Sequence, residues 1–120
     1  MGTFRDLTVY KKAFQLAMDI FKVSKKFPDE EKFGLTSQIR RSSRSVCSCI
    51  GEAYRKRKYE AHFISKTSDS DMENTETQVW LDFSLDCGYI NSDEYAQLSH
   101  LNEEVGKLIW YMINNPDKFT

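Results

Sequence analysis

Proline and glycine are scarce in this chain of 120 residues, which has two prolines and five glycines. Because both residues interrupt helices and are common in the turns of β-rich domains, their scarcity favours helices. Apolar runs are short as well. None approaches the roughly 20 residues of a membrane span, and the charged N-terminus is not followed by the apolar stretch of a secretory signal. We therefore expect one soluble domain, residues 1–120, without a membrane segment.

Cysteine and histidine are also too few, and too scattered, for the sites they usually build. The three cysteines, Cys47, Cys49 and Cys87, give an odd count without CxxC spacing, which argues against a disulfide framework or a zinc ribbon. His62 and His100 have no neighbouring nucleophile, and no glycine-rich phosphate loop is present. We expect no catalytic residue, no metal and no cofactor, and the free thiols favour a cytoplasmic location.

The first predicted helix, at about 8–26, has two apolar faces. One series recurs at three- and four-residue steps and predicts a core stripe: Val9, Ala13, Leu16, Ile20 and, after a longer step, Phe27. A second series follows the same spacing on an adjoining face: Tyr10, Phe14, Ala17 and Phe21. This apolar surface is wider than one bundle seam needs, so we expect Tyr10, Phe14 and Phe21 to form an oligomer interface.

The second and third predicted helices, at about 35–54 and 59–87, carry polar or small residues on their inner faces. The inner stripe of the second is Leu35, Ile39, Ser42, Val46, Ile50 and Ala53. That of the third is Phe63, Thr67, Ser70, Asn74, Thr77, Leu81 and Leu85. The polar groups in the middle of the third helix need hydrogen-bond partners if they are buried.

The fourth predicted helix, at about 92–115, has the clearest boundaries. Gly88 is a stop for the preceding helix, and Asn91 with Glu94 forms a capping-box pattern. Its apolar residues repeat as a heptad: Leu98, Leu101, Val105, Leu108 and Met112. Four helices of this length with short connections predict an all-α fold, an antiparallel up-and-down four-helix bundle.

Charge is unevenly distributed along the chain. Between Gln38 and Lys58 there are seven basic residues and one acid, a net charge of +6: Arg40, Arg41, Arg44, Arg55, Lys56, Arg57 and Lys58 against Glu52. Ten carboxylates and no Lys or Arg lie between Thr67 and Gly106. Such segregation either steers a polyanion to the basic segment or pairs basic and acidic faces between helices or subunits.

The run from Gly34 to Ala53 resembles the signature of the 23S ribosomal RNA intervening-sequence protein family, also called four-helix bundle proteins. The matching positions are Leu35, Gln38, Ile39, Arg40, Arg41, Ser45, Ile50 and Glu52. Two departures stand out. Cys47 and Cys49 replace the usual Pro and Asn, and Ala53 stands where the family has a glycine, so the second helix is free to run further.

The resemblance implies a four-helix bundle that assembles as a homopentameric ring. It also implies similarity to accessory proteins of diversity-generating retroelements, which bind nucleic acid and a reverse transcriptase. The family name records where some of the genes lie and is not a biochemical function. We expect a non-enzymatic homo-oligomer that binds RNA or DNA, with a protein such as a reverse transcriptase as a further partner by analogy.

The nucleic-acid hypothesis assigns the contacts to all seven basic residues of the Gln38–Lys58 segment, with Tyr54 and Tyr59 available to stack on unpaired bases. The competing interpretation is a protein-interaction scaffold, in which these arginines pair with carboxylates and Glu73 meets Arg40 or Arg44. A third and weaker alternative is a magnesium-dependent nucleotide hydrolase using Asp69, Glu73 and Glu76, but the second acidic element such enzymes need is missing.

Overall fold

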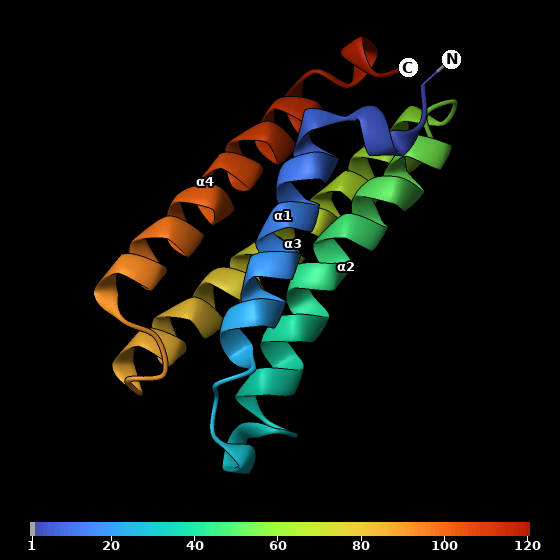
Figure 1. Ribbon diagram of the computed structural model, residues 1–120. Coiled ribbons are helices and arrows are strands. Elements are labelled where there is room, and N and C mark those ends of the chain that lie inside the picture. Colours follow the sequence, from blue (N-terminus) through green and yellow to red (C-terminus); the bar gives the residue numbers. More distant parts are fainter. Residues whose placement is uncertain (1) are drawn as a thin grey trace.

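The computed structural model describes residues 2–120 and consists of four long helices (Figure 1). These helices are α1 (Thr8–Ser24), α2 (Leu35–Arg55), α3 (Glu60–Asp86) and α4 (Ser92–Asn114). Each packs against the next in the sequence, and α1 closes the bundle against α4, which leaves α1 and α3 diagonally opposite. The all-α four-helix fold is confirmed, and every helix end lies within two residues of the sequence-based boundary.

Local signals account for most of the helix ends. The Asn91 side chain accepts a hydrogen bond from the Glu94 backbone N–H, and the Glu94 carboxylate accepts one from Asn91. Gly88 follows α3 with a φ of 77°, a left-handed conformation that glycine adopts without strain. The end of α2 has no glycine. Its last turn closes through a backbone hydrogen bond from Lys56 to Ala53, and the chain then turns directly into α3.

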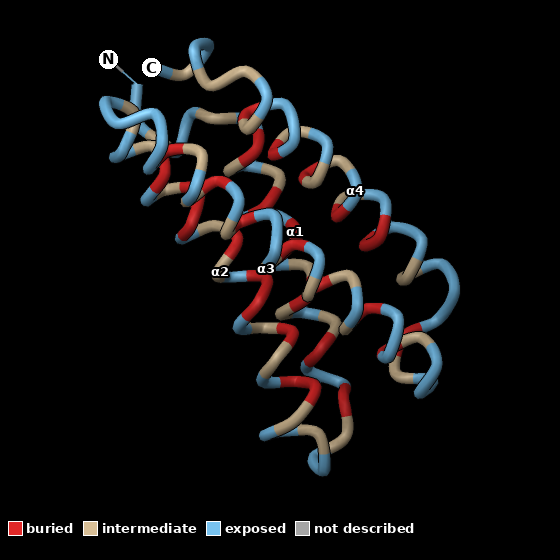
Figure 2. Tube along the Cα trace, turned by 180° about the vertical axis from the view of Figure 1, so that it is seen from behind, coloured by how far each residue is buried: buried red, intermediate tan, exposed pale blue. Residues whose placement is uncertain are grey.

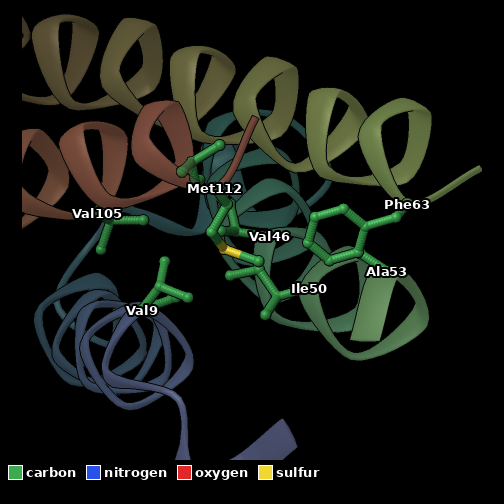
Figure 3. Packing of buried hydrophobic residues seen from close by; sticks show 9 residues of the cluster. Val9, Val46, Ile50, Ala53, Phe63, Val105 and Met112 are labelled. Carbon is green, nitrogen blue, oxygen red and sulfur yellow. The ribbon is translucent and has the colours of Figure 1, made fainter. Parts of the chain in front are cut away.

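The apolar core consists of two clusters, one toward each end of the bundle. The cluster nearer the α2–α3 turn contains Val9, Ala13, Val46, Ile50, Ala53, Phe63, Val105, Ile109 and Met112, whose side chains point toward one another (Figure 3). The other contains Leu16, Ile20, Phe27, Leu35, Ile39, Leu81, Ile90 and Leu98. Buried residues therefore line the facing sides of the helices, and exposed residues the outer sides (Figure 2).

A polar layer separates these two clusters. The side-chain amides of Asn74 on α3 and Asn102 on α4 each donate a 3.0 Å hydrogen bond to the other residue's backbone carbonyl, and the Asn102 amide also donates to the Asn74 side-chain oxygen at 2.9 Å. The hydroxyls of Ser42 and Thr77 lie 2.8 Å apart between α2 and α3. A Cβ on Gly106 would come within 3.3 Å of the Asn74 amide nitrogen, so the glycine leaves room for the pair. The polar middle of α3 thus finds partners inside the bundle, as burial requires.

Two details of the predicted core are wrong. On α4, Leu101 and Leu108 are only half-buried, and Asn102 and Ile109 take the central positions because Asn102 pairs with Asn74. On α3, Ser84 rather than Leu85 is fully buried, and its hydroxyl donates to the carbonyl of Trp80. Among residues 2–120, no helix has both the length and the apolar character to cross a bilayer.

Candidate nucleic-acid interface and assembly surface

The seven basic residues between Gln38 and Lys58 occupy three separate places on the bundle. Arg41 points toward α3, whereas Arg40 and Arg44 point toward α1, because residues one position apart on a helix diverge by about 100°. The remaining four, Arg55 to Lys58, are the last residue of α2 and the first three of the α2–α3 turn, and we call them together the cations of the turn. The turn lies at the same end of the bundle as the C-terminus (Figure 1). One continuous stretch of sequence therefore provides three distinct electrostatic environments.

Arg41 is engaged within the bundle. Its Nη1 lies 3.3 Å from Oε1 of Glu73, and its Nη2 forms an ion pair with Glu76, so the guanidinium bridges two consecutive turns of α3. The expected pairing of Glu73 with Arg40 or Arg44 is therefore wrong. The reason is rotational, since Arg41 is the arginine of this segment that lies on the α3 side of α2.

Arg40 and Arg44 instead cover an aromatic ring on α1. Their guanidinium carbons lie 4.9 and 5.7 Å from the centroid of Phe21, and Lys25 lies 4.9 Å from the same centroid. Arg40 also donates a 2.8 Å hydrogen bond from Nε to the Ser24 hydroxyl. Phe21 is thus half-buried beneath three cations, a setting that suits cation–π attraction.

The α2–α3 turn carries basic residues of a different kind. The Arg57 guanidinium stacks 3.7 Å above the Tyr54 ring, and its Nε donates to the Tyr54 carbonyl at 2.8 Å. The Lys56 ammonium lies 5.9 Å from the ring centroid of Tyr59, a residue that is 58% exposed. In the part of the chain that the structure describes, none of the four cations of the turn forms an ion pair with a carboxylate.

An open hollow of about 670 Å³ lies beside this turn. Its lining is Tyr54, Arg55, Arg57, Lys58, Tyr59 and Thr120. Guanidinium groups match phosphate oxygens bidentately, and exposed aromatic faces stack on bases. The hollow therefore combines the two kinds of group that bind a nucleotide chain.

A second hollow, of about 650 Å³, runs between α1 and α2, and we call it the α1–α2 groove. Its lining is Phe4, Tyr10, Phe14, Ala17, Met18, Arg44, Cys47, Ser48, Gly51, Glu52 and Arg55. The structure therefore brings together Tyr10 and Phe14 of the predicted oligomer interface, whereas Phe21 lies outside the groove under its three cations. Phe4 and Met18 complete the apolar surface. Met18 is one turn beyond Phe14, and this spacing could have identified it.

The carboxylates considered as metal ligands and the thiols of α2 are engaged or shielded within the bundle. The Arg41 guanidinium contacts both Glu73 and Glu76, and no cluster of three or more metal-binding side chains occurs within residues 2–120. Burial raises the pKa of the Cys47 thiol to about 11, which keeps it protonated and unreactive at neutral pH. Cys49 is buried, and desolvation raises its thiol pKa as well.

Comparisons with known proteins agree with the fold. The model of the family described as 23S rRNA-intervening sequence protein matches residues 5–111. One similar solved structure is a protein of unknown function from the S23 ribosomal protein family of Bacteroides thetaiotaomicron. It is 30% identical, with a TM-score of 0.80, over 88% of this chain and 95% of that chain. No curated protein sequence matches the chain.

Proposed function

The chain belongs to the 23S rRNA-intervening sequence protein family, and we propose that it is a non-enzymatic, self-assembling bundle that binds RNA or DNA through its α2–α3 turn. Of the seven basic residues expected to bind nucleic acid, the proposal assigns the main contacts to Arg55, Lys56, Arg57 and Lys58. Arg40 and Arg44 contribute at most long-range attraction from the α1 side, and Arg41 contributes to the bundle itself.

One observation carries the nucleic-acid proposal. Four consecutive cations at one end of the bundle have no carboxylate partner among the described residues, and they surround two tyrosines and an open hollow. Unpaired cations are costly to crowd together unless a polyanion approaches them, and neutralising phosphates releases condensed counterions. The aromatic rings add a contribution from stacking that is available only to unpaired bases.

Self-assembly is the second part of the proposal, and exposed apolar surface supports it. Phe14 and Met18 in the α1–α2 groove are 51% and 37% exposed, on a helix that also buries a complete core stripe on its other side. A contiguous apolar groove on a solvent-exposed surface marks an interaction site. We propose a homo-oligomer, with the ring of five copies that the family resemblance suggests, in the reducing environment of the cytoplasm, which suits three free thiols.

The absence of catalysis is also a proposal, and the state of the carboxylates supports it. A magnesium-dependent hydrolase would need the carboxylates of Glu73 and Glu76 free to bind the ion. The Arg41 guanidinium instead holds both of them.

A binding measurement with two matched charge reversals tests the nucleic-acid proposal. Fluorescence anisotropy of a labelled mixed-sequence RNA strand and of a DNA duplex would compare wild type, Lys56→Glu/Lys58→Glu, and Lys11→Glu/Lys107→Glu. Both variants change the net charge equally, and Lys11 and Lys107 are exposed residues of α1 and α4 outside the turn. The turn variant should lose about tenfold or more in affinity, and the control much less.

Equal losses in the two variants would contradict the turn as the binding site, because only the net charge would then matter. No measurable binding by wild type would favour the second candidate, a protein-interaction scaffold whose arginines are structural. The pairing of Arg41 with Glu73 and Glu76 favours that candidate for one arginine. Its partner would be a protein, such as the reverse transcriptase that the resemblance suggests.

A further inference from the structure

The outward face of α3 carries a line of exposed apolar residues. Met72, Val79 and Phe83 are 68%, 43% and 53% exposed. They recur at steps of seven and four residues, so they share one side of the helix. Nothing in the described chain covers this side, because α3 packs against α2 and α4 on its other faces. We call this line, with its flanking carboxylates, the α3 ridge.

Acidic residues border the α3 ridge along its length. Asp71, Asp82 and Asp86 are exposed and lie on one flank of the apolar line, since Asp71 and Asp82 each precede a ridge residue by one position and diverge from it by about 100°. Asp82 accepts a hydrogen bond from the Tyr95 hydroxyl at 2.6 Å through one oxygen, which leaves its charge and its other oxygen available. The ridge is therefore apolar along its centre and negative along its α4 flank.

The α1–α2 groove has the opposite electrostatic character around a similar apolar centre. Phe14 and Met18 supply exposed apolar surface, and Arg44 and Arg55 stand along its α2 side. Glu52 also lines the groove, and its charge is partly offset by the Lys66 ammonium, which lies 3.8 Å from Glu52 and 3.5 Å from Asp69. The two arginines still leave the groove positive. Groove and ridge are thus complementary both in apolar character and in charge.

The spacing of the charges matches as well. Arg44 and Arg55 are eleven residues apart on α2, and Asp71 and Asp82 are eleven residues apart on α3. Eleven residues make three helical turns, so each pair lies on one face with its members about 16 Å apart along the axis. Two parallel or antiparallel helices placed side by side would bring both arginines opposite both aspartates.

We propose that the α3 ridge of one copy of this chain docks in the α1–α2 groove of the next. The inference rests on the proposed self-assembly. Arg55 lines both the groove and the hollow beside the turn, whereas Lys56, Arg57 and Lys58 stay outside the groove and keep the nucleic-acid proposal separately testable. Groove and ridge are different surfaces on different sides of the bundle, since α3 lies diagonally across from α1. Such a head-to-tail contact repeats from copy to copy and closes into a ring when the rotation permits.

Light scattering after size-exclusion chromatography tests this docking with one variant on each surface. Phe14→Glu places a carboxylate in the groove opposite the aspartates of the ridge, and Phe83→Arg places a cation on the ridge opposite Arg44 and Arg55. Phe33→Glu is the matched control, since Phe33 is 88% exposed and belongs to neither surface. Circular dichroism and thermal unfolding of each variant establish that the bundle is intact.

Wild type and Phe33→Glu should assemble, whereas each single-surface variant should elute at the 14.1 kDa mass of one chain. A mixture of the two variants should recover complexes of at least two chains, because the first keeps an intact ridge and the second an intact groove. An interface in which the same surface meets itself cannot be rescued in this way.

Two results would overturn the docking model. One is assembly of a folded Phe14→Glu or Phe83→Arg variant on its own at the wild-type mass. The other is a mixture in which both folded variants remain single chains. If the wild-type protein is itself a single chain, the proposed self-assembly is wrong as a whole. If wild type assembles but either of the two results above is found, only the docking of ridge in groove is wrong.

Discussion

Arg41 of α2 contacts Glu73 of α3, with the arginine Nη1 3.3 Å from the glutamate Oε1. The Nη2 of the same guanidinium pairs with Glu76, so Arg41 links the two helices. The arginine thereby satisfies two of the ten carboxylates in the acidic segment between Thr67 and Gly106. Of the two interpretations of the segregated charge, pairing between helices holds for Arg41. The four cations of the α2–α3 turn have no such partner among the described residues, which is why they carry the proposed function.

Substitution of Arg41 separates its structural role from nucleic-acid binding. Because the side chain is 45% exposed and its pairs are solvent-screened, Arg41→Ala should lower the free energy of unfolding by only about 0.5 kcal/mol. Its affinity for RNA should stay close to wild type, whereas Lys56→Ala should weaken binding. Urea unfolding and anisotropy measure the two quantities. If Arg41→Ala loses as much affinity as Lys56→Ala, Arg41 is part of the binding surface.

The buried asparagine pair should be one of the most sensitive points of the bundle. Asn102→Ala removes the amide that donates to the side-chain oxygen and the backbone carbonyl of Asn74, while the Asn74 amide keeps its bond to the backbone carbonyl of residue 102. The buried Asn74 side-chain oxygen is then unpartnered, which should cost roughly 1–3 kcal/mol in urea unfolding. The double variant Asn74→Leu/Asn102→Leu removes both polar groups together and should cost less than the sum of the two single Leu changes. Additive losses would mean that the two amides do not stabilise each other.

Acid should weaken the contact between α1 and α4. The Lys26 ammonium lies 2.5 Å from Glu94 and the Lys12 ammonium 2.9 Å from Glu104, and these hydrogen bonds lower the pKa of both carboxyls below the ordinary 4.5. A lowered carboxyl pKa contributes stability that is complete above the ordinary value. That contribution is lost as the pH falls through the folded-state pKa.

Thermal unfolding between neutral pH and acid measures this effect. In Glu94→Gln/Glu104→Gln, the melting temperature should fall less steeply below about pH 5 than in wild type, because the two carboxyls with a lowered pKa have been removed. Glu103→Gln is a suitable control, because Glu103 is exposed and belongs to neither pair. Equal slopes in wild type and the double variant would show that the two ion pairs do not contribute.

The three thiols should differ widely in reactivity. Burial raises the pKa of Cys47 from 9.0 to about 11, so its thiolate is about a hundredfold rarer near neutral pH, and Cys49 is raised in the same direction. Cys87 is exposed. Alkylation of the folded protein should therefore show one fast thiol, which Cys87→Ser removes, and two slow ones that become fast in denaturant. Cys47 is half-buried and lines the α1–α2 groove, so its rapid labelling in the folded protein would contradict the raised pKa.

Much of the fold could be predicted because the signals were local. The three- and four-residue steps of Val9, Ala13, Leu16 and Ile20 identified the inner face of α1, and the Asn91–Glu94 capping box located the start of α4. The stripe on α4 was misjudged at Leu101 and Leu108. A central Asn102 violates the preference for apolar cores, and only the facing Asn74 makes that position favourable.

The candidate site was predictable in composition but not in geometry. The sequence identified a basic segment, yet it could not say which arginine would find a carboxylate, because that depends on the rotation of α2 against α3. Arg41 and Arg40 are neighbours in sequence, and one meets Glu73 while the other covers Phe21. The α3 ridge likewise became visible only when burial separated Met72, Val79 and Phe83 from the polar inner stripe of the same helix.

The dependence of RNA and DNA affinity on salt tests the central claim most directly. If the four cations of the α2–α3 turn each displace about one counterion, the plot of log affinity against log salt on a DNA duplex should have a slope near −3.5. The slope for Lys56→Glu/Lys58→Glu should be shallower by about 2. A slope near zero, or one that the turn variant leaves unchanged, would contradict nucleic-acid binding through this turn.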